Sequence, residues 1–249
     1  MDQSNTYEER KGRLETYFDR TAADKWTVLT TEEPVSGIRQ TVRAGRDAMR
    51  ATLLNWLPND LTGRRILDAG CGTGALAVEA ARRGADVVGV DVSSSLIDVA
   101  KARTPADLGS GSVLFVTGDM LSADFGQFDH IVAMDSLIHY RLADVLAAVE
   151  HMAPRVSRSI LFTFAPRTPL LAAMHWSGKL FPRDDRSPAI EPHAPNKIEA
   201  GLSAALAGQF QTARNHRVST AFYKSQALEL VSIRDFSGAG DPHCEVKAA

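Results

Sequence analysis

RRILDAGCGTGALAVEAARR, residues 64–83, predicts a strand, a glycine-rich turn and a helix in direct succession. Residues 64–70 have the apolar character of a buried parallel strand, and Gly84 is placed to end a helix over residues 74–83. Glycines between the two permit a tight turn and let a ligand approach the backbone, while the helix N-terminus offers free N–H groups. We therefore expect a ligand site at the carboxyl edge of a parallel sheet.

The same alternation of strand and helix continues along the chain. Further strands are predicted over residues 85–91, 113–119, 129–136, 158–164, 210–220 and 221–232. Further helices are predicted over residues 142–153 and 196–207, and Ser93 is expected to cap another that ends at Arg103. Regular alternation indicates a parallel sheet with right-handed crossovers. The expected fold is therefore α/β, with a mostly parallel seven-stranded sheet and helices on both faces.

The chain divides by composition. Helical spacing of apolar residues over 7–33 and 35–57 predicts two helices before the alternation of strands and helices begins. Prolines interrupt this alternation over residues 166–200. The expected division is residues 1–60 as an N-terminal helical lid, 61–235 as the main domain with a proline-rich flap and helix over 166–208, and 236–249 as a frayed tail.

Composition excludes several classes of protein. The 249 residues are 44% hydrophobic and 23% charged, which excludes disorder throughout the chain. A net charge of −2 gives no global attraction to nucleic acid, and none is expected as a partner. Two cysteines form no disulfide framework, and neither an apolar signal core nor a membrane-length apolar run is found. We expect a cytoplasmic protein with at most peripheral membrane contact.

Three aspartates end successive predicted strands. Asp68 precedes the glycine loop, Asp91 follows the second strand and Asp119 the third. The loop spacing is G-x-G-x-G, which differs from the G-x-G-x-x-G of dinucleotide sites. The alternative is that these aspartates only cap helices, but caps do not require aspartate at three successive strand ends. The pattern favours a nucleoside-type ligand with a ribose beside Asp91.

These motifs resemble the class I S-adenosyl-L-methionine-dependent methyltransferases, over residues 64–136. The resemblance implies a Rossmann-like fold in which Asp68 lies near the cofactor's ammonium group and Asp91 binds the ribose. By the same resemblance Val92 and Leu96 pack on the adenine, and Asp119 accepts from its amino group. The residues expected to border the cofactor are Asp68, Gly70, Cys71, Gly72, Gly74, Asp91, Val92, Leu96, Gly118, Asp119, Met120, Asp135 and Ser136. Cys71 has no adjacent sequence partner and is expected to be a packing residue rather than a nucleophile.

The fourth strand is followed by DSLIHY, residues 135–140. In class I methyltransferases this loop faces both the sulfonium of the cofactor and the methyl acceptor. His139 is therefore the candidate for a catalytic or substrate-orienting residue. The alternative is that His139 caps the helix that follows.

Four segments resemble one branch, the magnesium-protoporphyrin IX O-methyltransferases of (bacterio)chlorophyll synthesis. They are TYFDRTAADKWTVL (16–29), VSGIRQTVRAGRDAMRATLLNWLP (35–58), DSLIHY (135–140) and RVSTAFYKSQALELV (217–231). The resemblance implies methylation of one propionate of magnesium protoporphyrin IX, which gives the monomethyl ester and S-adenosylhomocysteine. It also implies that the magnesium chelatase hands over this poorly soluble substrate.

An arginine stripe fits an anionic acceptor. Arg39, Arg43, Arg46 and Arg50 are spaced 4, 3 and 4 residues apart, which places them on one side of the predicted helix. Arg39, Arg43 and Arg46 are the candidate substrate ligands, and the alternative is a solvated charged face. Tyr17 is a candidate catalytic residue and Trp26 a candidate substrate ligand, because either aromatic ring could close over the cofactor or the flat ring of the substrate. The alternative is that both belong to the core.

A propionic acid is already ionised at neutral pH, so this acceptor needs no strong base. We therefore expect His139 to orient the carboxylate and Tyr17 to help close the site. The seven histidines show no paired spacing with cysteines or carboxylates, so no protein-bound metal is expected. Three alternatives stay open: an O-methyltransferase for a phenol or quinone, which needs a true base, a dinucleotide-dependent oxidoreductase, and a non-catalytic binding module.

Overall fold

The computed structural model describes residues 3–19, 37–167 and 189–233, which contain one seven-stranded sheet of order β3-β2-β1-β4-β5-β7-β6. Its strands are β1 (Arg65–Ala69), β2 (Asp86–Asp91), β3 (Ser112–Thr117), β4 (Phe128–Ala133), β5 (Val156–Phe164), β6 (Phe210–Ser219) and β7 (Lys224–Ser232). The first five strands are parallel, and β7 pairs antiparallel with both β5 and β6. The expectation of a mostly parallel seven-stranded sheet is confirmed.

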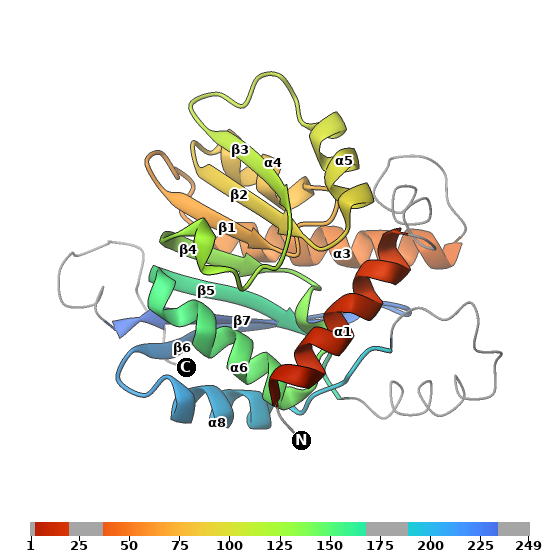
Figure 1. Ribbon diagram of the computed structural model, residues 1–249, viewed down its shortest axis with the longest axis vertical. Coiled ribbons are helices and arrows are strands. Elements are labelled where there is room, and N and C mark those ends of the chain that lie inside the picture. Colours follow the sequence, from red (N-terminus) through yellow and green to blue (C-terminus); the bar gives the residue numbers. More distant parts are fainter. Residues whose placement is uncertain (1–2, 20–36, 168–188, 234–249) are drawn as a thin grey trace.

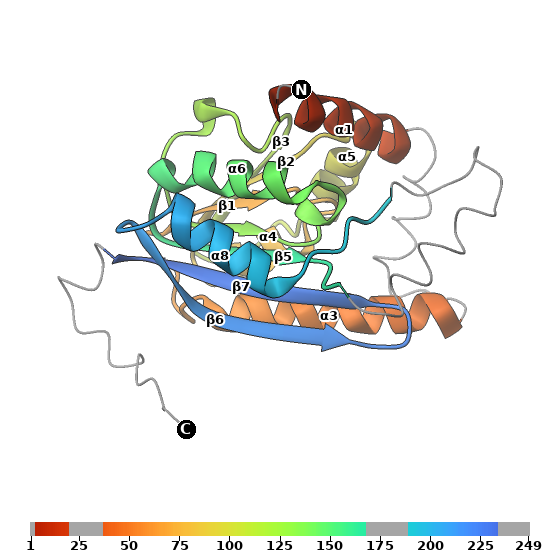
Figure 2. The same cartoon turned by 90° about the horizontal axis from the view of Figure 1, so that it is seen from below.

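Helices cover both faces of this sheet (Figures 1 and 2). They are α1 (Gln3–Tyr17), α3 (Gly37–Trp56), α4 (Ala75–Arg82), α5 (Ser94–Arg103), α6 (Leu142–Met152) and α8 (Pro195–Ala205). Short 3-10 turns are η2 (Ala123–Phe125), η3 (Leu137–His139) and η4 (Ala153–Arg155). The helices α3, α4 and α5 share one hydrophobic cluster with the sheet, and α1, α6 and α8 share the other.

Alternate residues of the central strands supply the two clusters. Ile66 of β1 and its register partner Val87 of β2 are fully buried on the α3–α4 side. Their neighbours Leu67 and Val88 are buried on the α6 side. Because side chains alternate between faces and both faces are covered, the strands have to be apolar at nearly every position.

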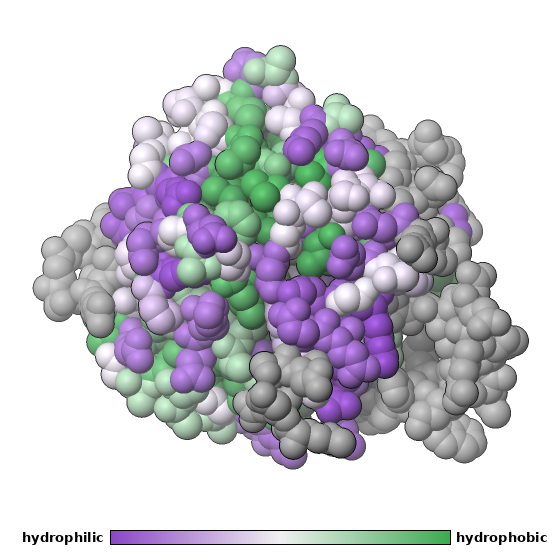
Figure 3. Space-filling model, viewed as in Figure 1, coloured by the Kyte–Doolittle hydropathy of each residue, from purple (hydrophilic) through white to green (hydrophobic). Residues whose placement is uncertain are grey.

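The expected lid over residues 1–60 divides into two parts. The helix α3 belongs to the body of the fold, because Met49 and Leu53 are fully buried in the core that it shares with α4. The helix α1 lies across the carboxyl ends of the strands (Figure 1), and the surface over it in Figure 3 is mainly hydrophilic. Ile38 has the helical spacing of the apolar residues of 35–57, but it lies in the first turn of α3 and is 56% exposed.

The proline-rich segment is described only at its ends. Residues 189–194 run beside the end of β5, where the backbone N–H of His193 donates to the carbonyl of Ala165 at 2.8 Å. Residues 168–188 and the tail from residue 234 lie outside the described residues. Among the helices that are described, none is both long and apolar enough to span a membrane.

Candidate active site

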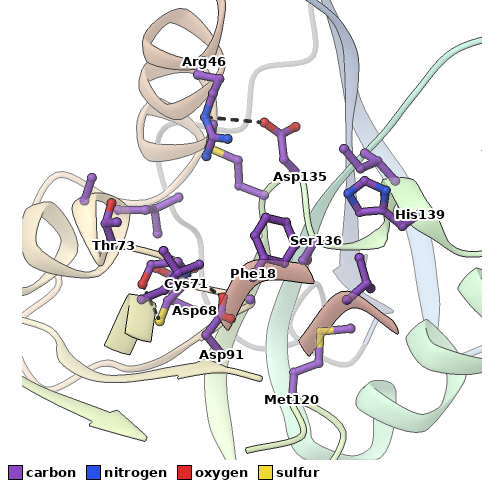
Figure 4. Close-up of a pocket in the computed structure, with 18 of the residues that line it drawn as sticks. Phe18, Arg46, Asp68, Cys71, Thr73, Asp91, Met120, Asp135, Ser136 and His139 are labelled. Carbon is purple, nitrogen blue, oxygen red and sulfur yellow. Dashed lines mark hydrogen bonds and ion pairs between the residues drawn. The ribbon is translucent and has the colours of Figure 1, made fainter. Parts of the chain in front are cut away.

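A cleft of about 690 Å³ opens at the carboxyl ends of the strands, between α1 and α3. Its volume is typical of sites that hold small organic molecules. Figure 4 shows Asp68, Cys71 and Asp91 at one end of the cleft and His139 toward the other. Most of the residues that the sequence predicts to border a cofactor do line this cleft. They are Asp68, Gly70, Cys71, Gly72, Asp91, Val92, Leu96, Gly118, Met120, Asp135 and Ser136.

The glycine loop brings two strand ends into contact. Gly70 has a φ of +80°, and a Cβ atom there would lie 2.3 Å from the Cβ of Ser136. No side chain fits between the loop that follows β1 and the loop that follows β4. Glycine at position 70 is therefore required both by its left-handed backbone and by this close approach.

Asp68 carries the main electrostatic feature of this end of the cleft. It is 2% exposed, and its Oδ2 has no hydrogen-bond partner among the described residues. Burial, opposed by a hydrogen bond from the backbone N–H of Ala77 and assisted by the charge of Asp91, raises the pKa of Asp68 to about 7. An unpaired buried carboxyl group that lines a cleft is suited to a cationic ligand group.

Asp91 organises the backbone next to it. Its two oxygens accept the N–H groups of Gly72 and Ser93, each at 2.9 Å. Burial raises the pKa of Asp91, and these two hydrogen bonds oppose the shift. The hydroxyl of Ser93 accepts the N–H of Leu96 at 3.2 Å, which confirms the expected cap of α5. The same hydroxyl donates to Asp19 at 2.6 Å and ties the end of α1 to α5.

Two expected cofactor residues do not line the cleft. Asp119 accepts from the hydroxyl of Tyr7 and the ammonium of Lys11, both at 2.8 Å, and so holds α1. Burial raises the pKa of Asp119, but the hydrogen bonds from Lys11, Leu121 and Tyr7 lower it overall. Gly74 lies against Phe115 at the start of α4.

Cys71 lines the cleft, and its sulfur lies under the loop, 3.2 Å from where a Cβ of Gly89 would be. Burial raises the pKa of the Cys71 thiol well above its ordinary value, with smaller contributions from the charges of Asp68 and Asp91. The thiolate is the reactive form of cysteine, so this environment favours packing over nucleophilic chemistry.

The loop that follows β4, residues 135–140, contains the turn η3 and is held from both sides. His139 is buried at the end of this turn, and its Nδ1 lies 3.3 Å from the carbonyl of Ala189. The guanidinium of Arg10 donates to the carbonyl of His139 and, at 2.7 Å, to Glu191. The N-cap position of α6 is Arg141, so His139 does not take the capping role that was its alternative.

Asp135 ends β4 earlier than expected and anchors a polar network. Its φ of +55° turns the chain out of the strand after Ala133. The hydroxyl of Tyr223 lies 3.0 Å from both carboxylate oxygens of Asp135, and the hydroxyl of Thr163 donates at 3.2 Å. The Nε of Arg46 lies 4.0 Å from Oδ2, the ion pair drawn in Figure 4.

The arginine stripe of α3 divides along its length. Arg43, Arg46 and Arg50 line the cleft, whereas Arg39 is exposed and is not among the lining residues. Arg50 pairs with Asp47 of the same helix at 2.8 Å. The wall of the cleft formed by α3 is thus cationic, with its charge partly offset.

The aromatic residues of the N-terminal segment are arranged differently from the expectation. Phe18 and Tyr7 line the cleft, whereas Tyr17 borders a shallow surface depression with Arg13 and Thr16. The geometry therefore gives no support to a catalytic role for Tyr17. Trp26 lies outside the described residues.

Other lining residues were not singled out by the sequence. They are Leu14, Val42, Asp47, Thr73, Ala75, Leu76, Val90, Met134, Ile138, Tyr140, Ile190, Phe222 and Tyr223. The available signal for Phe222 and Tyr223 was their place within RVSTAFYKSQALELV. Within the described ranges, no cluster of three or more His, Cys, Asp and Glu side chains is placed to hold a metal ion.

Comparisons with known proteins agree with this geometry. The family model "Magnesium-protoporphyrin IX methyltransferase C-terminus" matches residues 133–232, and a general methyltransferase domain model matches residues 66–158. The chain is 51% identical to a magnesium-protoporphyrin O-methyltransferase of Rhodobacter capsulatus, over 90% of this chain and 97% of the relative. Its identity to the Synechocystis protein of the same name is 31%, over 86% of this chain and 93% of that one.

A solved structure agrees as well. The crystal structure of the Synechocystis magnesium protoporphyrin IX methyltransferase with bound SAH superposes with a TM-score of 0.78 at 30% identity, covering 89% of this chain and 99% of that one. Many other methyltransferase structures share the fold at lower identity, among them the N-methyltransferase NodS of Bradyrhizobium japonicum, at 16%.

Proposed function

Because this chain belongs to the family of magnesium-protoporphyrin O-methyltransferases, we propose that its cleft methylates one propionate carboxylate of magnesium protoporphyrin IX. The chain is an S-adenosylmethionine-dependent methyltransferase of (bacterio)chlorophyll synthesis. The products are the monomethyl ester and S-adenosylhomocysteine. The magnesium ion belongs to the substrate.

The end of the cleft at Asp68 fits the cofactor. The unpaired Oδ2 of Asp68 would accept the ammonium group, and Asp91 would accept the ribose hydroxyls with its remaining lone pairs. Val92, Leu96 and Met120 would enclose the adenine, since all three line the cleft. When bound, the cofactor supplies an activated methyl group on a sulfonium.

Asp119 fits the adenine amino group less directly. Its oxygens already accept from Tyr7 and Lys11 of α1. A carboxylate has further lone pairs, so one amino group can be added without displacing the helix. In this arrangement α1 and the cofactor share one carboxylate.

The acceptor end does not require a strong base. A propionic acid has a pKa close to 4.3, so its carboxylate is a competent nucleophile at neutral pH. The task of the chain is to align the acceptor oxygen with the methyl group and to exclude water, and alignment contributes up to about 7–11 kcal/mol in favourable cases. His139 orients the carboxylate from its buried position in the loop that follows β4. Phe18 and α1 cover the cleft.

Substrate delivery is part of the proposal. Phe222 and Ile190 line the mouth of the cleft and remain 51% and 38% exposed, which suits an apolar macrocycle that enters there. We expect hand-over from the magnesium chelatase, and at most peripheral contact with the photosynthetic membrane. Co-sedimentation with vesicles and crosslinking to the chelatase subunits test these two expectations separately.

The observation that carries the function is that one cleft joins Asp68, a buried carboxyl group whose Oδ2 has no partner among the described residues, to an arginine-lined wall on α3. The test is an assay with magnesium protoporphyrin IX and methyl-labelled S-adenosylmethionine. We expect labelled monomethyl ester in stoichiometric balance with S-adenosylhomocysteine. If calorimetry shows cofactor binding while no ester forms, the porphyrin assignment is wrong.

A further inference from the structure

The wall of the cleft on α3 has an unusual charge pattern for a site that consumes an anion. Arg43, Arg46 and Arg50 line it, and aspartates lie among them: Arg46 pairs with Asp135 and Arg50 with Asp47. The side chains of Arg46 and Asp135 are 22% and 7% exposed, so this pair is largely withdrawn from water. This combination of arginines and aspartates on the wall is explained below by the group that the wall binds.

Methyl transfer to a carboxylate cancels charge. The carboxylate oxygen forms a bond to the methyl carbon, and the carbon–sulfur bond breaks with its electron pair left on sulfur. A negative and a positive charge both disappear, and no proton moves. A guanidinium bound to the reacting carboxylate would therefore stabilise the ground state more than the transition state, and it would slow the reaction.

The acceptor, as proposed above, carries two propionates, and only one reacts. We propose that Arg43 and Arg46 bind the propionate that is not methylated, and that Asp135 and Tyr223 hold Arg46 in position for this. The inference rests on the proposed function. It assigns the α3 wall to anchoring and leaves the reacting carboxylate at the loop of Ser136 and His139.

The anchoring of Arg46 is built from three elements. Asp135 lies just after β4, Tyr223 directly precedes β7, and Arg46 lies on α3. The hydroxyl of Tyr223 contacts both oxygens of Asp135 at 3.0 Å, and Ser225 adds a contact at 3.3 Å, so the carboxylate that faces Arg46 is fixed. Asp135 and Tyr223 are positioning residues in this scheme.

The backbone of α3 is also fitted to this contact. A Cβ at Gly45 would lie 2.5 Å from the ring of Tyr223, so the helix and the ring are in direct contact next to Arg46. Arg43 lies three residues before Arg46, about one helical turn along the same face. The two guanidinium groups can therefore approach one carboxylate together.

The arrangement accounts for a monoester as the product. To be methylated a second time, the monoester would have to turn over and place its ester group against Arg43 and Arg46. An ester has no charge for these arginines, so the second encounter loses the anchoring contact. The wall therefore acts as a specificity determinant for a dicarboxylate over its monoester.

The experiment tests each enzyme variant with each of two acceptors, so that the effect of a substitution can be compared between the acceptors. The acceptors are magnesium protoporphyrin IX and the isomeric monomethyl ester that is not the enzyme's own product, which keeps the reactive propionate free. The enzymes are wild type, Arg43→Gln, Arg46→Gln, Arg46→Lys and Tyr223→Phe. Arg82→Gln is the control because Arg82 is exposed on α4 and does not line the cleft. Each acceptor is also titrated by fluorescence quenching in the presence of S-adenosylhomocysteine, which measures binding without turnover.

For wild type we expect kcat/KM for the dicarboxylate to exceed that for the monoester by about 10- to 100-fold, mainly through KM. Arg43→Gln and Arg46→Gln should lower kcat/KM for the dicarboxylate much more than kcat/KM for the monoester, so that the two values become nearly equal. Tyr223→Phe should raise KM for the dicarboxylate with little change in kcat, Arg46→Lys should restore part of the preference, and Arg82→Gln should keep all of it.

Three results would overturn the inference: an active wild type that does not discriminate between the acceptors, variants that slow both acceptors equally, or a Tyr223→Phe variant that changes kcat and not KM. Melting curves and binding of S-adenosylhomocysteine establish that each variant is folded. A wild type that methylates neither acceptor would instead contradict the proposed function, so the two failures are distinguishable.

Discussion

The hydroxyl of Tyr7 lies 2.8 Å from Oδ1 of Asp119, and this contact joins α1 to the loop that follows β3. Lys11 donates to the other oxygen of the same carboxylate at 2.8 Å. Burial, with the charge of Asp119, raises the pKa of Tyr7, so the phenol stays protonated and remains a donor. The helix that covers the cleft is thus held through the carboxylate that follows β3.

Tyr7→Phe removes this hydrogen bond and leaves the ring stacked on Tyr140. We expect faster amide exchange in α1, because the free energy that holds this helix against the loop after β3 falls by about 1 kcal/mol. Hydrogen–deuterium exchange of peptides within residues 3–19 measures this. Arg13→Gln on the outer surface of α1 is the control, and equal exchange in the two variants would count against the contact.

Asp68→Asn should have opposite effects on stability and on binding. Burial raises the pKa of Asp68 to about 7, so the folded protein keeps a proton that the unfolded chain releases near pH 4. Its contribution to stability is present below that lower pH and is lost as the pH rises toward 7. The variant should therefore raise the free energy of unfolding of the cofactor-free protein at pH 8, by about 2 to 4 kcal/mol.

The same variant should weaken cofactor binding by about 10- to 100-fold, because the ammonium group loses its charged partner. Chemical denaturation at pH 5 and pH 8, together with calorimetry using S-adenosylhomocysteine, checks both effects. Lower stability at pH 8 with unchanged affinity would show that Asp68 is a structural residue.

His139→Ala should lower kcat by about 10-fold through loss of alignment, without removing an ionisation from the pH profile. The acceptor carboxylate is already charged, so no proton has to be taken up in the transfer step. The measurement is kcat/KM between pH 6 and 8 for both enzymes. Should the wild-type profile show an ionisation near neutral pH that disappears in the variant, His139 would be a general base.

Gly45→Ala should destabilise the protein, although alanine is the better helix former. The added methyl group would lie 2.5 Å from the ring of Tyr223, so α3 or the ring must move, at a cost of about 1 to 3 kcal/mol. Gly12→Ala is the matched control, because nothing lies within 4 Å of its Cβ position in α1. Melting temperatures should fall for the first variant and stay level or rise for the second.

His130 should make the protein sensitive to mild acid. Burial lowers the pKa of His130 to about 4, and its Nε2 has no partner among the described residues. The unfolded chain takes up this proton below pH 6.5, so the stability is present above that pH and is lost toward pH 4, by about 2 kcal/mol at pH 5. His130→Asn, which keeps a polar group toward Ser159, should show a flatter curve in denaturation from pH 7 to 5.

The strands and most helices could be predicted from the sequence because both faces of the sheet are covered, which leaves a continuous apolar signal in each strand. Ser93 and Gly84 also followed from local chemistry. The predicted strand over 129–136 was too long, because Asp135 takes a left-handed conformation that a non-glycine residue rarely adopts.

The site residues could be predicted from the sequence where they directly follow a strand. They could not be predicted where they depend on contacts between residues far apart in the sequence. The contact of Tyr223 with Asp135 spans 88 positions and depends on the pairing of β7 with β5. The face that α1 turns toward the cleft could not be predicted either, because its few apolar residues among many polar ones define that face only weakly. Phe18 rather than Tyr17 lines the cleft for that reason.

The contact between Gly70 and Ser136 has a consequence for how such enzymes diversify. Since no side chain fits at position 70, the backbone of this loop lies directly against the Cβ of Ser136, and the spacing between the two loops is fixed by that contact. A change of substrate therefore cannot be made by adjusting this spacing. It has to be made elsewhere in the lining of the cleft, on the α3 wall and around Ile190 and Phe222.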